Sequence, residues 1–497
     1  MKGHNFFQIL MVSFLTWLTL PTLSNEFLLW RHKPLFAAAV EATNSSLVLA
    51  GVLLSLIVIF LASKIGGELC DRIDLPPVLG ELVGGVVVGV SALRLLVFPE
   101  GGEDGSHSLL MSLMQLTANL SPEALTSVFQ AQSEVISVLS ELGVIILLFE
   151  IGLQSDLKEL LRVGPQATVV AVVGVVVPFA LGTAGLSVIF GVATVPAIFA
   201  GAALTATSIG ITAKVLAEMQ RLSTPEGQII IGAAVLDDVL GIIVLAVVAS
   251  LARDGTVEPT KVVYLIFSAG VFLVGAVLVG RFLSPFFVAL VNGMKTRGQL
   301  LLTSLIFAFF LAYVAAVIQL EAILGAFAAG LVLAETEKQQ ELEEKVLPIA
   351  DMLVPVFFVV VGARTDLSVL NPMVPENREG LIIAAFLLVV AIVGKVVTGL
   401  SVFGMPGVNR LAIGVGMIPR GEVGLVFAAV GSESGVLSKP LEAAVIVMVI
   451  LTTFLAPPWL RLVFKRSDDA TKGDASKQAV ALNPSLVDLE RVEPESK

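Results

Sequence analysis

Two adjacent aspartates occur in the middle of a long apolar stretch of the chain. Asp237 and Asp238 lie within Gly232-Ala-Ala-Val-Leu-Asp-Asp-Val-Leu-Gly-Ile-Ile-Val244. A charged side chain at the centre of a bilayer costs at least about 2.5–3.5 kcal/mol, so two of them require a partner, a cation or protons. Neighbouring helix residues point about 100° apart, so one carboxylate can face a cavity while the other faces a partner. The pair therefore predicts an ion or proton site; a purely structural pair held by hydrogen bonds is the alternative.

A single lysine lies deep in a later apolar stretch. Lys395 occurs in Val389-Val-Ala-Ile-Val-Gly-Lys-Val-Val397, about two and a half helical turns before the loop that begins near Gly404. Its natural partner is an aspartate of the pair. The alternative is a lysine that extends its ammonium group to the membrane surface.

Polar residues also interrupt two other apolar stretches. Thr205, Thr207 and Ser208 offer hydroxyl oxygens, which suit a hard cation such as sodium. Glu422 follows Pro419 and Arg420 and could complete the cation site or hold a crossing of broken helices. The alternatives are hydroxyls bonded to carbonyls of the preceding turn and an Arg–Glu pair that satisfies half-helix ends.

We therefore predict two overlapping sets of functional residues. The predicted cation ligands are Asp237, Asp238, Thr207 and Ser208. The predicted ion-transport residues are Asp238, Asp237, Lys395, Glu422 and Thr205. We expect no catalytic residue and no cofactor.

The composition requires a membrane around these residues. Of the 497 residues, 56% are hydrophobic and only 14% charged, whereas soluble domains carry about 25% charged residues. The formal net charge of −11 and the absence of long basic runs argue against a nucleic-acid partner. Cys70 is the only cysteine, and all three histidines lie in the N-terminal quarter, outside the long apolar runs. Thiolate metal clusters and histidine proton carriers in the membrane are thereby excluded.

The apolar runs predict an all-α polytopic membrane protein with about thirteen transmembrane helices, since each span needs about 20 apolar residues. The predicted spans are 46–69, 76–98, 134–154, 164–190, 193–217, 226–250, 261–290, 299–319, 321–335, 345–362, 380–403, 409–433 and 440–463. The polar loop 99–133 could hold a surface helix.

The fifth and twelfth predicted spans are interrupted. The fifth contains Leu204-Thr-Ala-Thr-Ser-Ile-Gly-Ile-Thr212, and the twelfth contains Gly414-Val-Gly-Met-Ile-Pro-Arg-Gly-Glu-Val-Gly424. Proline removes a helix donor and glycine weakens a helix. Because the breaks lie seven spans apart, the two spans run in opposite directions. That is the arrangement of an inverted repeat whose broken helices meet at the midplane.

The chain ends and the loop charges predict the domain limits and the orientation. Residues 1–25 resemble a secretory signal peptide, or else form an extra N-terminal helix. Residues 46–463 form the membrane domain, and the polar residues 467–497 are predicted to be a disordered tail. Most Lys and Arg of the short loops follow odd-numbered spans, which places those loops and the C-terminus in the cytoplasm.

Several segments together resemble the monovalent cation:proton antiporter family that includes bacterial sodium/proton antiporters, from about residue 46 to 463. The segments that carry the resemblance are Pro76-Pro-Val-Leu-Gly-Glu-Leu-Val-Gly-Gly85, Leu142-Gly-Val-Ile-Ile-Leu-Leu-Phe149, Gly152-Leu-Gln-Ser-Asp156, Ala203-Leu-Thr-Ala-Thr-Ser208, Asp237-Asp238, Pro355-Val-Phe-Phe-Val-Val-Val-Gly362 and Arg420-Gly-Glu-Val-Gly424. Each is moderately specific; their order and spacing make the set highly specific.

The resemblance implies a homodimer and a division of roles. Spans one to three and eight to ten would form a dimerisation domain, and spans four to six and eleven to thirteen an ion-carrying core. Asp238 would be the main ion-binding carboxylate, with Asp237 the partner of Lys395. Family members with an Asp-Asp pair and the lysine are mostly electrogenic. Glu150 and Gln154 are less usual in the second segment and leave the choice of ion open.

We therefore expect a secondary transporter that exchanges sodium, lithium or potassium for protons across the bilayer of a cell membrane or an internal membrane. A potassium/proton antiporter and a sodium-coupled symporter of a small organic solute are the alternatives. An intramembrane aspartyl protease needs facing carboxylates, which adjacent residues of one helix do not provide. A channel would need a filter-like sequence, and none is present.

Overall fold

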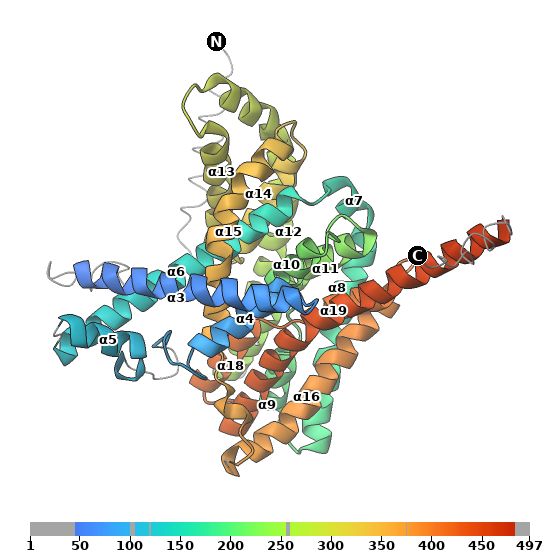
Figure 1. Ribbon diagram of the computed structural model, residues 1–497. Coiled ribbons are helices and arrows are strands. Elements are labelled where there is room, and N and C mark those ends of the chain that lie inside the picture. Colours follow the sequence, from blue (N-terminus) through green and yellow to red (C-terminus); the bar gives the residue numbers. More distant parts are fainter. Residues whose placement is uncertain (1–44, 100–104, 119–120, 255–258, 374, 483–497) are drawn as a thin grey trace, which may run out of the picture.

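The computed structural model describes residues 45–99, 105–118, 121–254, 259–373 and 375–482 (Figure 1). The predicted signal peptide or extra helix at 1–25 lies outside the described residues. Within the described ranges every regular element is a helix, as the apolar runs predict. Eight of these helices are long and apolar enough to cross a membrane, and several shorter apolar helices accompany them.

The described helices follow one another along the whole chain. The first half holds α3 (Ser45–Arg72), α4 (Pro77–Val88), α5 (Leu109–Ala118), α6 (Pro122–Leu153), α7 (Leu157–Arg162), α8 (Gly164–Ile189), α9 (Thr194–Ala202), α10 (Ile209–Glu218) and α11 (Pro225–Asp254). The second half holds α12 (Pro259–Gly293), α13 (Gln299–Val317), α14 (Ala322–Ala334), α15 (Gln339–Ala363), α16 (Pro375–Leu400), α17 (Arg410–Gly416), α18 (Glu422–Glu433) and α19 (Lys439–Leu482). Short 3-10 turns occur at Gly105–His107 and Leu367–Leu370.

Each of the thirteen predicted spans has a counterpart, with α9–α10 and α17–α18 forming the two broken ones. The limits differ where local chemistry overrides hydropathy. The second span ends at Val88 instead of 98, because Gly89 leaves the helical conformation and packs closely on Ala363 of α15. The helix of the third span begins earlier, at Pro122, because the Ser121 hydroxyl caps it by accepting from the N–H of Ala124 at 3.3 Å.

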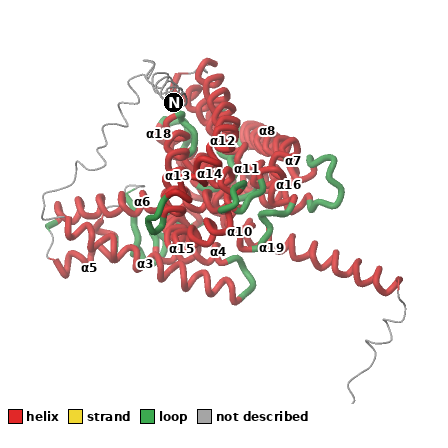
Figure 2. The backbone as a smooth tube through the Cα atoms, turned by 90° about the horizontal axis from the view of Figure 1, so that it is seen from above, coloured by secondary structure: helices red, strands yellow, loops and turns green. Residues whose placement is uncertain are grey.

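The C-terminal tail also differs from its prediction. Residues 467–497 were expected to be disordered, yet α19 continues to Leu482 and extends away from the bundle (Figure 2). Residues 469–482 include four alanines and two lysines, which favour helix, and the next proline is Pro484. Residues 483–497 lie outside the described range.

The helices pack into two groups, which we name the scaffold domain and the core domain. The scaffold domain comprises α3, α4, α6 and α12–α15, and the core domain comprises α8–α11 and α16–α19. Figure 1 shows the scaffold helices in the upper and left parts of the view, with α8, α9, α16 and α19 at the lower right. The short helix α7, capped by Asp156, joins α6 to α8.

Corresponding helices of the two halves make corresponding contacts. In the scaffold domain α3 packs on α4 as α13 packs on α14, and α6 packs on α14 as α15 packs on α4. In the core domain α8 packs on α9 and α11 as α16 packs on α17 and α19. These paired contacts are those of the predicted inverted repeat, with α12 as the linker between the halves.

Glycines allow the scaffold helices to approach closely. A Cβ added at Gly152 of α6 would lie 3.0 Å from the Cα of Gly330 on α14, and one at Gly362 of α15 would lie 3.0 Å from the Cα of Gly85 on α4. Small residues at such crossings are typical of helix packing in membranes. Gly85 and Gly330 therefore serve close helix packing.

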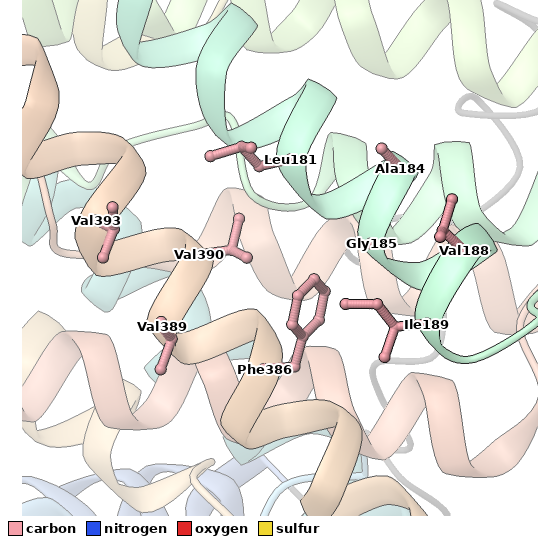
Figure 3. Close-up of a pocket in the computed structure, with 9 residues that line it drawn as sticks. All are labelled: Leu181, Ala184, Gly185, Val188, Ile189, Phe386, Val389, Val390 and Val393. Carbon is pink, nitrogen blue, oxygen red and sulfur yellow. The ribbon is translucent and has the colours of Figure 1, made fainter.

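A groove on the outside of the core domain runs between α8 and α16 (Figure 3). All nine residues that line it are apolar or glycine: Leu181, Ala184, Gly185, Val188, Ile189, Phe386, Val389, Val390 and Val393. It offers no polar side chain to an ion, so this groove is not the ion site.

Candidate ion-binding site

The two broken helices cross inside the core domain. α9 ends at Ala202 and α10 begins at Ile209, while α17 ends at Gly416 and α18 begins at Glu422. Lipid cannot satisfy the backbone groups freed by such breaks, so the chain must do so itself.

The two unwound segments bond to each other. The Ser208 N–H donates to the Pro419 carbonyl at 2.8 Å, and the Thr207 hydroxyl donates to the Met417 carbonyl at 3.1 Å. One turn further, the Thr212 hydroxyl donates to the Gly416 carbonyl at 2.8 Å. The crossing therefore rests on the hydroxyl residues that interrupt the fifth span.

Close approach at the crossing depends on glycine. A Cβ added at Gly421 would lie 2.6 Å from the hydroxyl oxygen of Ser208, closer than the two atoms can come without a shift. Pro419 has no backbone N–H to donate within a helix, so it breaks the twelfth span. At this break the Pro419 carbonyl is free to accept from the Ser208 N–H.

The aspartate pair lies in α11, beside this crossing. Asp237 is 0% exposed and Asp238 is 3% exposed. A Cβ added at Gly241, one turn further along α11, would lie 3.4 Å from the Cβ of Ala206 in the unwound segment. The turn of α11 that carries the carboxylates therefore passes the unwound segment of the α9–α10 span.

Lys395 of α16 binds one of the two carboxylates. Its Nζ donates to Oδ2 of Asp237 at 2.9 Å, and both side chains are 0% exposed. A Cβ added at Gly174 of α8 would lie 3.1 Å from Nζ, so the ammonium group is enclosed by α8 and α11. The predicted contact is present, and the alternative of a lysine reaching the membrane surface is wrong.

The remaining predicted ligands have separate positions. The Thr205 hydroxyl donates to the Ala202 carbonyl at 2.7 Å, so it bonds to the preceding turn, as the alternative interpretation has it. Oδ1 of Asp237 and the hydroxyl oxygen of Ser208 are buried without a hydrogen-bond partner. A cation or a proton could satisfy each of these two oxygens.

Two features bear on a metal site and on Glu422. Among the described residues no group of three or more His, Cys, Asp or Glu is placed to hold a metal ion. A cation here would be held by two carboxylates together with hydroxyl or carbonyl oxygens, as the ligand prediction requires. Glu422 is the first residue of α18, and its side chain lies outside the described part of the structure. Its role stays a prediction.

Arg420 has a larger role than the sequence indicated. It is 0% exposed, its Nη1 donates to the Ala206 carbonyl, and its own carbonyl accepts from the Thr453 hydroxyl. Its charge acts on both Asp237 and Lys395. The guanidinium thus joins the two unwound segments and adds positive charge beside the aspartates. The sequence signal that could have indicated this role is an arginine directly after a proline inside an apolar stretch.

An inverted repeat, two crossed broken helices and a buried Asp-Asp-Lys group together define a secondary transporter of cations. The family model "Sodium/hydrogen exchanger, transmembrane" matches residues 52–466, and the chain belongs to this family.

Individual relatives agree with the family assignment. The chain is 69% identical to the high-affinity Na⁺/H⁺ antiporter NhaS3 of Synechocystis sp. over 90% of this chain and 97% of that protein. It is 32% identical to the Na⁺/H⁺-K⁺ antiporter GerN of Bacillus cereus, over 83% of this chain and 96% of that protein. The solved structure of the sodium proton antiporter MjNhaP1 from Methanocaldococcus jannaschii matches with a TM-score of 0.55 at 15% identity, over 86% and 97% of the two chains. That last likeness concerns the fold.

Proposed function

We propose that this protein exchanges sodium for protons across a membrane, by competition of the two ions at Asp238. The observation that carries the proposal is the hydrogen bond between Lys395 and Asp237. This bond gives the two adjacent carboxylates different surroundings, because Asp237 accepts a hydrogen bond from the Lys395 ammonium group. Asp238 is then the carboxylate that exchanges its counter-ion. The names of NhaS3 and GerN support sodium and protons as the exchanged ions.

Competition follows from burial. A carboxylate at 3% exposure is costly in its charged form, so Asp238 holds a proton when no cation is bound and the pH is not high. Sodium stabilises the ionised form, and proton and sodium therefore exclude each other. The Ser208 hydroxyl and the crossing of the broken helices supply further oxygens and backbone dipoles. A core domain that moves only when Asp238 is neutralised, by either ion, couples the two fluxes without a cofactor.

The experiment is ion-dependent proton flux in proteoliposomes, with sodium, lithium and potassium compared. We expect Asp238→Asn to abolish sodium-driven proton movement while the protein stays folded. Asp366→Asn is the control, since Asp366 is an exposed carboxylate that caps a short turn at Ser368. Exchange by Asp238→Asn at near the parental rate would overturn the proposal. Potassium-driven flux that exceeds sodium-driven flux would favour the potassium/proton alternative, which the printed name of GerN makes specific.

The geometry also supports transport over catalysis. An aspartyl protease dyad needs two facing carboxylates that share a proton. Here the two aspartates are neighbours on α11, and Asp237 bonds to Lys395. The arrangement supports our proposal that the protein is not an enzyme.

We propose a homodimer joined through the scaffold domain. The outer face of α3 exposes a stripe of large apolar residues at helical spacing: Leu49, Leu53, Ile57, Leu61, Ile65 and Leu69. Native mass spectrometry of the purified protein tests this, and a monomer in all mild detergents would count against it.

We propose further that the C-terminus is cytoplasmic, because the loops on its side carry most of the Lys and Arg. A reporter fused after Lys465 should not be labelled from outside intact cells. Labelling of that fusion would reverse the proposed orientation.

A further inference from the structure

The two domains meet through an apolar surface near the ion site. A Cβ added at Gly210 of α10 would lie 3.5 Å from Phe357 and Val144 and 3.9 Å from Leu147, all on scaffold helices. Such a surface has no directional bonds that fix one position of the core domain against the scaffold.

Charged and polar contacts between the domains occur where α3 turns into α4. Helix α4 begins at Pro77 after Pro76 and has no side-chain cap of its own. Glu218, the last residue of α10, which packs on α4, feels the backbone N–H of Val78 in the first turn of α4. A carboxylate at a helix N-terminus is stabilising, because it satisfies free N–H groups and opposes the helix dipole. A core-domain carboxylate therefore lies near the N-terminus of a scaffold helix.

A second contact reaches the loop just before α4. Asp74 lies in the α3–α4 loop and has a left-handed backbone, with φ of 60°. Nη2 of Arg461 and Nζ of Lys465, both on α19, lie 2.8 Å from Oδ1 and Oδ2 of Asp74, respectively. One carboxylate of the scaffold domain thus binds two cations of the core domain.

The same charged side chains act at both contacts. Arg461 acts on Glu218 as well as on Asp74, and Lys214 of α10 is the cation that acts most strongly on Glu218. Glu81 of α4 is a like charge near Glu218, and its Oε1 accepts from the Ser63 hydroxyl at 3.0 Å. Lys64 and Asp351, on the scaffold domain, act on Glu81 together with Lys214. The carboxylates of this cluster are thus offset by cations from both domains.

We propose that Glu218 with the first turn of α4, and Asp74 with Arg461 and Lys465, form an interdomain latch that holds the core domain in the conformation described here. Its release is one step of each movement of the core domain. The inference rests on the proposed exchange, which requires that movement. The latch needs no ligand, and it acts at the rim of the domain interface, away from the ion-binding aspartates.

The test is a distance measurement between the domains that needs no transport. Cys70 is replaced by serine, and spin labels are placed at Leu347 on α15 and Leu411 on α17, both exposed. Pulsed electron spin resonance then gives the distance distribution in sodium-free nanodiscs. We expect the double variant Asp74→Asn, Glu218→Gln to shift the ratio of latched to released molecules about fivefold towards released molecules, the combined effect of one carboxylate near a helix N-terminus and one surface pair.

Two matched controls lack an interdomain contact. Glu68→Gln removes an exposed carboxylate that pairs with Arg72 inside the scaffold domain. Glu226→Gln removes a carboxylate that accepts from the Asn409 N–H inside the core domain. Both should keep the parental distribution. High salt, about 1 M, should shift the parent in the direction of the Asp74→Asn single variant, because it screens exposed charges.

A double variant with the parental distance distribution would overturn the latch. So would a shift of equal size in either control. Loss of sodium-driven flux in the parent would overturn the proposed exchange and leave this distance measurement unchanged, so the two failures are distinguishable.

Discussion

Two ion pairs of nearly equal length occur in different surroundings. Lys395 and Asp237 are 2.9 Å apart with both side chains 0% exposed, whereas Arg461 and Asp74 are 2.8 Å apart with side chains 29% and 60% exposed. The buried pair joins two helices of one domain, and the exposed pair joins two domains. Breaking a buried pair leaves a charge that water cannot reach, while exposed pairs contribute little and are screened by salt. The buried pair is therefore suited to a rigid ion site, and the exposed pair is suited to a contact between domains that must open.

The largest effect is expected from the buried pair. Lys395→Ala leaves Asp237 buried without its ammonium partner and should destabilise the protein by about 3–5 kcal/mol. Thermal unfolding in detergent measures this. The double variant Asp237→Asn, Lys395→Met should recover much of the loss, because neither charge remains. Unchanged melting of Lys395→Ala, together with an unchanged transport current, would refute the importance of the pair.

A smaller effect is expected at the helix crossing. Gly421→Ala places a methyl group 2.6 Å from the Ser208 hydroxyl oxygen and should cost about 1–3 kcal/mol through overpacking. Gly270→Ala on α12 is the control, since an added Cβ there meets nothing within 4 Å. We expect Gly421→Ala to lower both the melting temperature and the sodium affinity. Equal behaviour of the two variants would show that the crossing tolerates expansion.

The smallest effect is expected at Asp74. The hydrogen bond from Lys465 and the charge of Arg461 hold the pKa of Asp74 below its ordinary value of 3.8. A lowered folded-state pKa means that the contact is fully present above the ordinary value and is lost only as pH falls through the lower one. The Asp74 contact should therefore be constant across the working pH range. When Asp238→Asn removes the titration of the ion site, the distance distribution of Glu218→Gln, in which Asp74 is the remaining arm, should accordingly not change between about pH 5 and pH 9. A pH-dependent shift in that variant would contradict this.

The architecture was predictable because its signals are local. Apolar runs locate the spans, and Pro419 with its neighbouring glycines locates one of the two breaks, since proline and glycine act on their own turn of helix. The helix ends at Val88 and Leu482 were not predicted from the sequence. The first depends on a tertiary contact of Gly89, and the second depends on the helix propensity of a polar tail.

The candidate site was predictable to the extent that charge in an apolar stretch is rare. Asp237, Asp238 and Lys395 stand out for that reason, and the structure brings Lys395 onto Asp237. The bond of Arg420 to the Ala206 carbonyl and the approach of Glu218 to Val78 depend on which elements meet in three dimensions. The residue pattern within one segment does not predict these contacts between distant segments. The functional roles of Thr205, Thr207, Ser208 and Glu422 stay predictions.

The central claim is that sodium and protons compete for Asp238. Calorimetric titration of sodium into the purified protein at a series of pH values tests it most directly. The account predicts that apparent sodium affinity rises by about tenfold per pH unit while the carboxylate is protonated, and levels off once it is ionised. One proton should be released for each sodium ion bound on the rising limb. A sodium affinity that ignores pH across the working range would contradict the account.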